Sequence, residues 1–240
     1  MCAMNPRLLR PLASGFNPLT PSTIEGLELW LDASESSTLT LNATTVSEWR
    51  DRRSGSNRKA VQATALNQPD YEPSAIGGKP GVYFPSATWM DTTGDTMGFA
   101  QPVTYFVVVK TPASGDGTIF DTDGTGRHVV SYDSVGDQMR MYAGAFVFAF
   151  TGDVAPGQDN AMALIFNGAS SLAARNGGGL QAVGNTGAIG ANSQIKLGAF
   201  ANDLTQWNGR IAEFLLYNSA LQAADVASLM AYARIKWGVA

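Results

Sequence analysis

The sequence contains one cysteine and one histidine in 240 residues. Cys2 has no second cysteine with which to pair, so the chain forms no internal disulfide and its stability must come from packing. His128 alone cannot build a zinc site, and no serine or cysteine nucleophile motif accompanies it, so we expect it to be structural. The sequence therefore predicts no metal site and no cofactor.

Charge and long apolar runs are also scarce. Charged residues make up 15% of the chain, the formal net charge is −4 and the pI is about 4.9, which argues against nucleic-acid binding through overall charge. No apolar run approaches the ~20 residues of a transmembrane helix. Arg7 and Arg10 are not followed by the apolar region of a secretory signal. We expect no nucleic-acid partner, no membrane partner and no export through a standard signal peptide.

The sequence is rich in β-strand patterns. Leu27, Leu29 and Leu31 alternate with less apolar neighbours, which is typical of a half-buried strand. Residues 103–109 are apolar throughout, which predicts a central strand covered on both faces. The 26 glycines suit many tight turns, and no alternation of strands and helices suggests a parallel α/β fold. Further strands are predicted at residues 46–50, 81–84, 161–166 and 194–200.

A hairpin is predicted over residues 138–151. Met139 and Met141 alternate on its first strand, and Ala143-Gly144 forms the turn. The second strand is expected to carry three aromatic residues on one face: Phe146, Phe148 and Phe150.

The end of the chain changes from a strand to a helix. Residues 211–217 are almost all apolar, and residues after 218 follow a helical period that ends at Gly238. This helix is expected to cover one face of a sheet with the stripe Val226, Leu229, Met230, Ala233 and Trp237. The predicted fold is all-β: an antiparallel β-sandwich of the jelly-roll type, with one C-terminal helix and an extended N-terminal arm.

The arm comprises residues 1–25, and the sandwich comprises residues 26–240. Four prolines, at positions 6, 11, 18 and 21, predict an extended and non-helical backbone for the arm. Its apolar side chains are Leu8, Leu9, Leu12 and Phe16. One interpretation is a frayed chain end; the other is an arm that docks on a neighbouring protein subunit, so that the protein works as an oligomer or in a larger assembly.

Three segments together resemble the concanavalin A-like lectin/glucanase superfamily, in its laminin-G-like branch. They are residues 27–51 (LELWLDASESSTLTL, then VSEWRD), residues 78–84 (GKPGVYF), and residues 208–221 (NGRIAEFLLYNSAL) with the following helix. The resemblance extends over most of the chain after residue 26 and implies a concanavalin A-like jelly roll. The chain departs from the superfamily pattern after Phe84. Residues 85–90 stand there in place of a Gly-rich turn, which often contacts ligands in the superfamily.

Catalysis is not expected. The resemblance implies that a hydrolytic member would carry a Glu-x-Asp-x-Glu strand, which sets two carboxylates about 5 Å apart. None of the six glutamates here forms that pattern. Asp121 and Asp123 lie two residues apart before glycines, which suggests a polar turn more than a calcium loop. Glu213, alone in an apolar strand, is expected to pair with an arginine such as Arg210.

A basic run surrounds residues 54–57 and offers a possible contact for an anionic partner. The alternative is a solvated loop with Glu48 and Asp51 as counter-charges. Four tryptophans, at positions 30, 49, 89 and 207, could stack on sugars if exposed, but core positions are more common for them in a sandwich. The basic run consists of Arg50, Arg52, Arg53, Arg58 and Lys59.

These observations favour a non-enzymatic virion protein of a tailed phage, either a structural or decoration protein or an adhesion protein, with the sandwich displayed outward and the arm anchored to neighbouring subunits. Release by lysis would explain the lack of an export signal. The alternative is a lectin-like module that binds glycans at a bacterial cell surface or outside the cell.

Overall fold

The computed structural model describes residues 20–95, 98–122, 126–190, 194–201 and 205–239. Within them the chain is almost entirely β, with one α-helix, α1 (Ala223–Trp237), and short 3-10 turns at Pro21–Thr23, Ser36–Thr38, Ala65–Asn67 and Gly168–Ser170. The strands are β1 (Leu27–Asp32), β2 (Leu39–Asn42), β3 (Thr45–Arg50), β4 (Lys59–Val61), β5 (Asp70–Ile76), β6 (Lys79–Tyr83), β7 (Met90–Thr93), β8 (Val103–Lys110), β9 (Gly117–Thr122), β10 (Val129–Asp133), β11 (Gln138–Tyr142), β12 (Phe146–Ala149), β13 (Asp159–Phe166), β14 (Ser171–Arg175), β15 (Gln181–Gly184), β16 (Ile195–Leu197) and β17 (Arg210–Tyr217).

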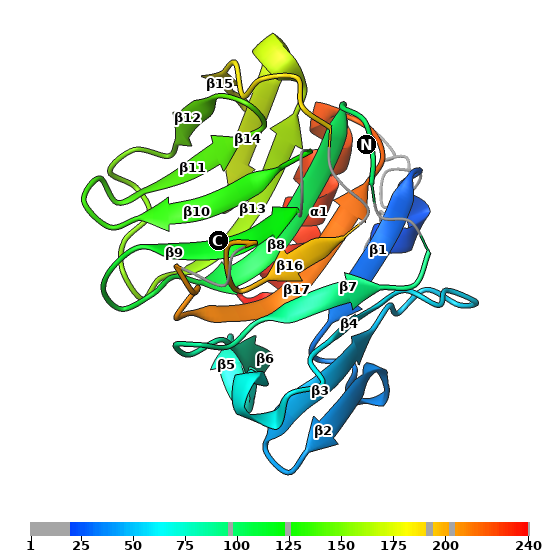
Figure 1. Cartoon of the computed structure of the whole chain (residues 1–240). Coiled ribbons are helices and arrows are strands. Elements are labelled where there is room, and N and C mark those ends of the chain that lie inside the picture. The colour runs from blue at the N-terminus through cyan, green and yellow to red at the C-terminus, as the bar shows by residue number, and fades with distance from the viewer. Residues whose placement is uncertain (1–19, 96–97, 123–125, 191–193, 202–204, 240) are drawn as a thin grey trace, which may run out of the picture.

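The strands form two antiparallel sheets packed face to face (Figure 1). The helix-side sheet has the order β1-β17-β8-β13-β14-β15, and β6 joins β17 beside β1. The open sheet has the order β2-β3-β4-β7-β16-β9-β10-β11-β12. The hairpin of β5 and β6 links the two sheets, because β5 also pairs with β3. The predicted β-sandwich with a C-terminal helix is confirmed.

The central strand β8 shows how the layers are built. Val107 and Val109 point into the core between the two sheets, whereas Phe106 and Val108 point toward α1. The same division continues in β17, its neighbour. A strand covered on both faces has no position that favours a polar side chain, which explains the continuous apolar run in the sequence.

Helix α1 covers the helix-side sheet with the stripe that its sequence predicts. Val226, Leu229, Met230, Ala233 and Trp237 are its buried residues. The helix ends at Gly238, which adopts a left-handed conformation with φ of 70°. Gly77, in the turn between β5 and β6, lies against this end: a Cβ atom there would be 1.9 Å from the carbonyl oxygen of Trp237.

The chain from residue 20 to residue 25 is packed with the sandwich. Pro21–Thr23 forms one 3-10 turn, so the prediction of a fully extended arm is wrong for these residues. Ile24 is buried in the layer between the helix-side sheet and α1, and the Tyr217 hydroxyl donates a 3.1 Å hydrogen bond to the Pro21 carbonyl. The apolar arm residues Leu8, Leu9, Leu12 and Phe16 lie outside the described residues.

The predicted hairpin exists as β11 and β12, with one difference. Phe146 and Phe148 are exposed on the face opposite the core, but Phe150 packs against the core. Phe150 has a φ of 58°, which ends the alternation of the strand. The sequence patterns also missed β9, β10 and β14, which are short strands next to glycine-rich turns.

Candidate functional site

One face of the open sheet lies opposite the sandwich core, and within the described residues no helix or second sheet packs on it, although Thr118, Asp121, Val129 and Ser131 at its centre are buried. We call it the outer face. Residues paired directly across antiparallel strands share a face, and Met139 and Met141 point into the core. The register therefore places two rows on the outer face: Asp91, Lys196, Asp121, Val129, Tyr142 and Phe146; and Thr118, Ser131, Arg140 and Phe148.

Three cations on or beside the outer face each pair with a carboxylate and lie near an aromatic ring. The first is Lys196 on β16. Its Nζ is 2.9 Å from Asp91 Oδ1 on β7 and 4.9 Å from the centre of the Trp89 ring. Lys196 stands between two core residues of its strand, so its side chain must point outward.

The second cation is Arg127, from the segment between β9 and β10. Its Nε donates a 3.0 Å hydrogen bond to Asp121 Oδ1, and a second guanidinium nitrogen contacts the other carboxylate oxygen. That oxygen also accepts a 2.9 Å bond from the backbone N–H of Ala201. The guanidinium lies 5.6 Å from the centre of the Phe200 ring. Asp121 is fully buried beneath these donors.

The third cation is Arg140 on β11. It is 2.7 Å from Asp133 Oδ2, 3.6 Å from Asp116 Oδ2, and 5.9 Å from the centre of the Phe148 ring. Burial acts to raise the pKa of Asp133, but bonds from Gln138, the Val135 backbone and Arg140 outweigh it and hold this pKa below its usual value.

The hairpin of β11 and β12, where both rows of the outer face end, is the most exposed aromatic surface of the described chain. Phe146 is 57% exposed and Phe148 is 50% exposed. The rings of Tyr142 and Phe146 lie 4.6 Å apart at 41°. Flat apolar rings beside charge-assisted donors and acceptors can hold a ligand that has both an apolar face and hydroxyl groups.

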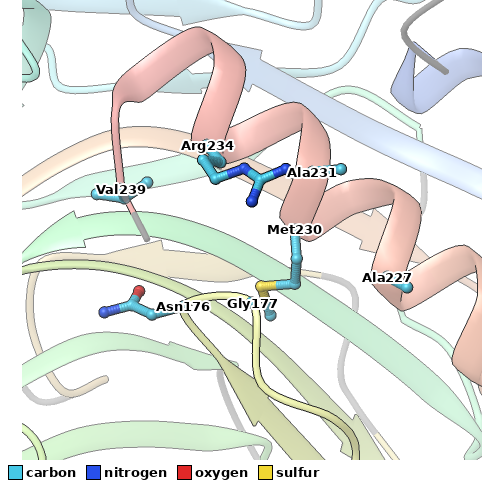
Figure 2. Close-up of a pocket in the computed structure, with 7 residues that line it drawn as sticks. All are labelled: Asn176, Gly177, Ala227, Met230, Ala231, Arg234 and Val239. Atoms are coloured by element: carbon cyan, nitrogen blue, oxygen red, sulfur yellow. The ribbon is translucent and has the colours of Figure 1, made fainter. Parts of the chain in front are cut away.

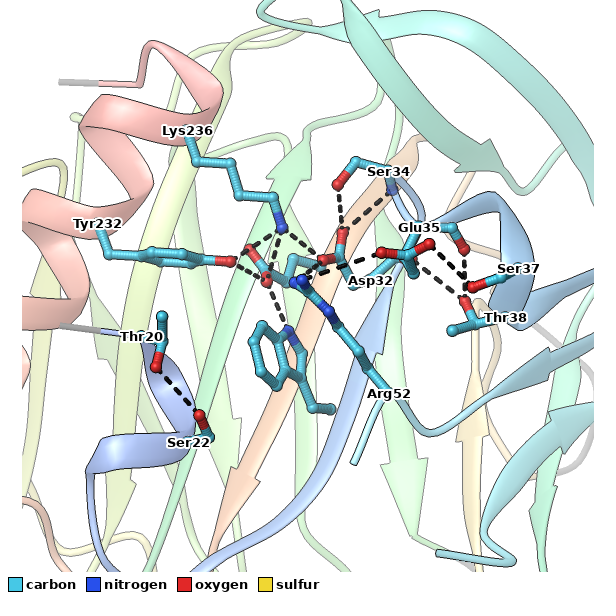
Figure 3. A network of polar contacts seen from close by, with 12 residues as sticks. Thr20, Ser22, Asp32, Ser34, Glu35, Ser37, Thr38, Arg52, Tyr232 and Lys236 are labelled. Atoms are coloured by element: carbon cyan, nitrogen blue, oxygen red, sulfur yellow. Dashed lines mark hydrogen bonds and ion pairs between the residues drawn. The ribbon is translucent and has the colours of Figure 1, made fainter. Parts of the chain in front are cut away.

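A second polar cluster lies beneath α1 and is closed. Glu213 Oε1 accepts bonds from Trp30 Nε1 and Tyr232 OH, each at 2.7 Å, and Oε2 accepts a 2.6 Å bond from Trp237 Nε1. Lys236 is 3.1 Å from Glu213 and 2.7 Å from Asp32. Figure 3 shows Lys236 between Tyr232 and Asp32, with Arg52 beyond. These groups hold α1 to the sheet.

The predicted pairing of Glu213 with Arg210 is wrong. A bulge between Ile211 and Glu213 places Glu213 on the same face as Val108, which points toward α1. Arg210 instead binds Glu72, with nitrogen–oxygen distances of 2.8 and 2.9 Å.

Every member of the predicted basic run is paired within the chain. Arg50 and Lys59 share Glu48 at 2.9 and 2.6 Å, and both lie on the outer face, on β3 and β4. The other three bind carboxylates near β1: Arg52 with Asp32 at 2.7 Å, Arg53 with Asp51 at 2.8 Å, and Arg58 with Glu28 at 2.6 Å. An anionic partner for this run stays a prediction, and such a partner would have to compete with these carboxylates.

Two hollows lie away from the outer face. One, of about 330 Å³, lies between α1 and the turn at Asn176 and Gly177 (Figure 2). Asn176 Oδ1 already accepts a 2.8 Å bond from the Ala161 backbone, so this side chain serves the turn. The other, of about 300 Å³, lies between the loop at residues 53–58 and Asp95. Its two arginines, Arg53 and Arg58, are paired with Asp51 and Glu28.

His128 is buried between the two sheets. Its Nδ1 is 3.0 Å from the Tyr105 hydroxyl, its Nε2 is 3.0 Å from the Ile189 carbonyl oxygen, and its ring stacks on Phe166 at 4.6 Å. Within the described ranges, no group of three or more His, Cys, Asp or Glu side chains is placed to hold a metal ion, and no helix is long and apolar enough to cross a membrane.

Comparison with known proteins shows the fold alone. No family model matches the chain, and no curated protein matches it. A Trypanosoma rangeli sialidase in complex with sialic acid is similar in structure, with a TM-score of 0.58 and 18% identity over 91% of this chain. The binding domain of botulinum neurotoxin serotype G has a TM-score of 0.62 and 14% identity over 88% of this chain. The chain spans only 36% of the sialidase and 53% of the toxin domain.

Sequence patterns identified only part of the outer face. They predicted the hairpin aromatics, but not the cations Lys196, Arg127 and Arg140. A usable signal exists for two of them: Lys196 lies between Ile195 and Leu197, and Arg140 lies between two methionines. A lone charged residue between apolar residues of a strand points away from the core. Three of the four tryptophans discussed above are buried, whereas Trp89 is only partly buried.

Proposed function

We propose that this chain is a non-enzymatic recognition domain that binds glycans on its outer face and serves in adhesion. The observation that carries the proposal is the row of three cation–carboxylate–aromatic groups, which ends at the half-exposed rings of Phe146 and Phe148. The similarity to a sialidase bound to sialic acid and to a toxin's binding domain supports it at the level of the fold.

The row has the dimensions of an extended site. Lys196 and Arg140 lie on β16 and β11, which are three strand spacings apart, or about 14 Å. A chain of sugar rings lying across the strands would meet aromatic rings with its apolar faces. Its hydroxyl groups would meet the partly exposed side chains of Asp91, Arg127 and Arg140, which are already fixed in place by their pairing. Fixed polar groups lose little conformational entropy when a ligand binds.

The absence of catalysis is part of the same proposal. Retaining glycoside hydrolysis by the common two-carboxylate route needs one protonated carboxyl group and one free carboxylate about 5 Å apart. On the outer face, Asp91, Asp121 and Asp133 are each bound to a cation at hydrogen-bond distance. For Asp133, bonds from Gln138, the Val135 backbone and Arg140 outweigh burial and hold the pKa below its usual value, so this carboxyl group is not a proton donor near neutral pH.

The test is glycan binding with a matched pair of variants. We expect the wild-type protein to bind members of a glycan array, and Phe148→Ala to weaken binding about tenfold because a stacking surface is lost. Ile235→Ala is the control, since Ile235 is 62% exposed on α1, at the other side of the two sheets, and its binding should equal that of the wild type. Lack of binding by the wild type, or equal losses in the two variants, would overturn the proposal.

A second proposal concerns assembly. Residues 20–25 are fixed to the sandwich through Ile24 and the bond from Tyr217 to Pro21, so the attachment point of the arm has a defined position on the domain. We propose the role predicted from the sequence: a virion protein of a tailed phage whose arm binds neighbouring subunits, with a bacterial cell surface as the alternative location. Deletion of residues 1–19 should abolish incorporation into the assembly while the melting temperature is kept; unchanged incorporation would refute it.

A further inference from the structure

We infer that the aromatic end of the outer face selects neutral sugars over anionic ones. This inference rests on the proposed glycan-binding function and names the class of ligand for the same site. It predicts a preference different from that suggested by the sialic acid bound to the similar sialidase.

The local charge at the hairpin is negative. One guanidinium group, Arg140, is bound by two carboxylates, Asp133 at 2.7 Å and Asp116 at 3.6 Å. The Asp133 side chain is 7% exposed, whereas that of Asp116 is 39% exposed and faces solvent. Beside Phe148, therefore, an incoming ligand meets an excess of one negative charge.

The neighbouring residues add to this excess. Asp137 Oδ1 accepts a 2.8 Å bond from the Tyr132 hydroxyl. Burial, followed by the bond to Asp137 and then by the charges of Asp137, Asp116 and Asp133, raises the pKa of Tyr132 above its usual range. Three carboxylates thus act on one small region of the open sheet.

The other cations of the row do not offset this charge. Lys196 and Arg127 each have a carboxylate of their own. The surplus positive charge of the outer face lies at Arg50 and Lys59, which share Glu48. Lys59 is on β4, five strand spacings or about 24 Å from β11. That separation is about three Debye lengths at physiological ionic strength, so this charge is screened at the hairpin.

The two kinds of sugar would meet this region differently. A neutral sugar can stack on Phe148 and donate hydroxyl hydrogen bonds to the exposed Asp116 carboxylate. A sugar carboxylate that approached the partly exposed Arg140 would compete with Asp133 and Asp116, which already bind its guanidinium group, and it would be repelled by the exposed Asp116. Two like charges about 4 Å apart in water weaken binding about fivefold.

The experiment uses a glycan array on which neutral oligosaccharides are paired with their sialylated and uronic acid-containing forms. We expect each bound neutral glycan to bind about fivefold or more tightly than its anionic form at physiological salt. Stronger binding of the anionic forms would overturn this inference and leave the glycan-binding function standing. Lack of binding to every glycan would instead overturn the proposed function, and this inference with it.

A charge variant tests the cause. Asp116→Asn keeps an oxygen that can accept the bonds now donated by the Ser134 backbone and hydroxyl, and it removes the surplus charge. The ratio of neutral to anionic affinity should fall toward one. Asp225→Asn, on α1 at the other side of the two sheets, is the control and should leave the ratio unchanged. An unchanged ratio in Asp116→Asn would refute the electrostatic explanation.

Discussion

His128 makes the stability of this protein depend on pH in a predictable way. The imidazole is fully buried, with Nε2 donating to the Ile189 carbonyl oxygen and Nδ1 accepting from the Tyr105 hydroxyl. This arrangement fits the neutral ring. Burial lowers the pKa of His128 from 6.5 to about 4, and the bond to Ile189 opposes this shift only in part. In the unfolded chain the ring is free to bind a proton at pH 6.5 and below.

The sign and the magnitude follow from linkage. Between about pH 4 and pH 6.5 the unfolded chain binds a proton that the folded protein does not, so stability falls as the pH is lowered through this range. With these two pKa values, the free energy of unfolding should be about 2 kcal/mol lower at pH 5.0 than at pH 7.5.

Two measurements check the prediction. Urea unfolding at pH 5.0 and pH 7.5 gives the difference in free energy. The single histidine should also give one imidazole NMR signal in the folded protein, and that signal should not shift between pH 7.5 and pH 5.5. A signal that titrates with a midpoint near pH 6.5 would refute the reasoning, because the ring would then be free to bind a proton in the folded state.

Three further predictions concern the packing of the fold. Glu213→Ala should lower the free energy of unfolding by about 4 kcal/mol, because buried donors including an ammonium group lose their acceptor. Its control is Glu72→Ala, at a partly exposed ion pair, which should lower the free energy of unfolding by less than about 1 kcal/mol. Equal losses in urea unfolding would count against this account. Leu229→Asp puts a charge into the layer beneath α1, so no folded domain should be recovered; soluble protein with a normal thermal transition would contradict the packing described. Gly77→Ala should lower the melting temperature more than Gly55→Ala does, since both glycines have positive φ but only Gly77 lies against backbone; equal shifts would argue against this contact.

The sequence was most informative where one periodicity continues over many residues. The stripe from Val226 to Trp237 predicted both α1 and its buried face, because an amphipathic helix repeats its pattern over several turns. The apolar run at residues 103–109 likewise predicted a strand covered on both faces. Short strands such as β9 and β10 have too few residues to establish a period beside glycine-rich turns.

The site was harder to predict because its parts meet only in the folded chain. Lys196 meets Asp91 and Trp89 across more than 100 positions of sequence, and no local pattern encodes that register. A single bulge decided the partner of Glu213, since one extra residue in a strand changes the face of the residues after it. Phe150 packs against the core and does not share the face of Phe146 and Phe148, because its positive φ breaks the alternation of the strand.

The two ends of the described chain have a consequence for how many copies could act together. Ile24 and Val239 are both buried in the layer beneath α1, so the chain enters and leaves on the side away from the outer face. Copies held to one support at this side of the sandwich would all present their outer faces outward. For a surface with many identical glycans, such an array can raise the overall affinity by about 10²–10⁴ over one copy without any new contact. A weak individual site would then be sufficient for firm attachment.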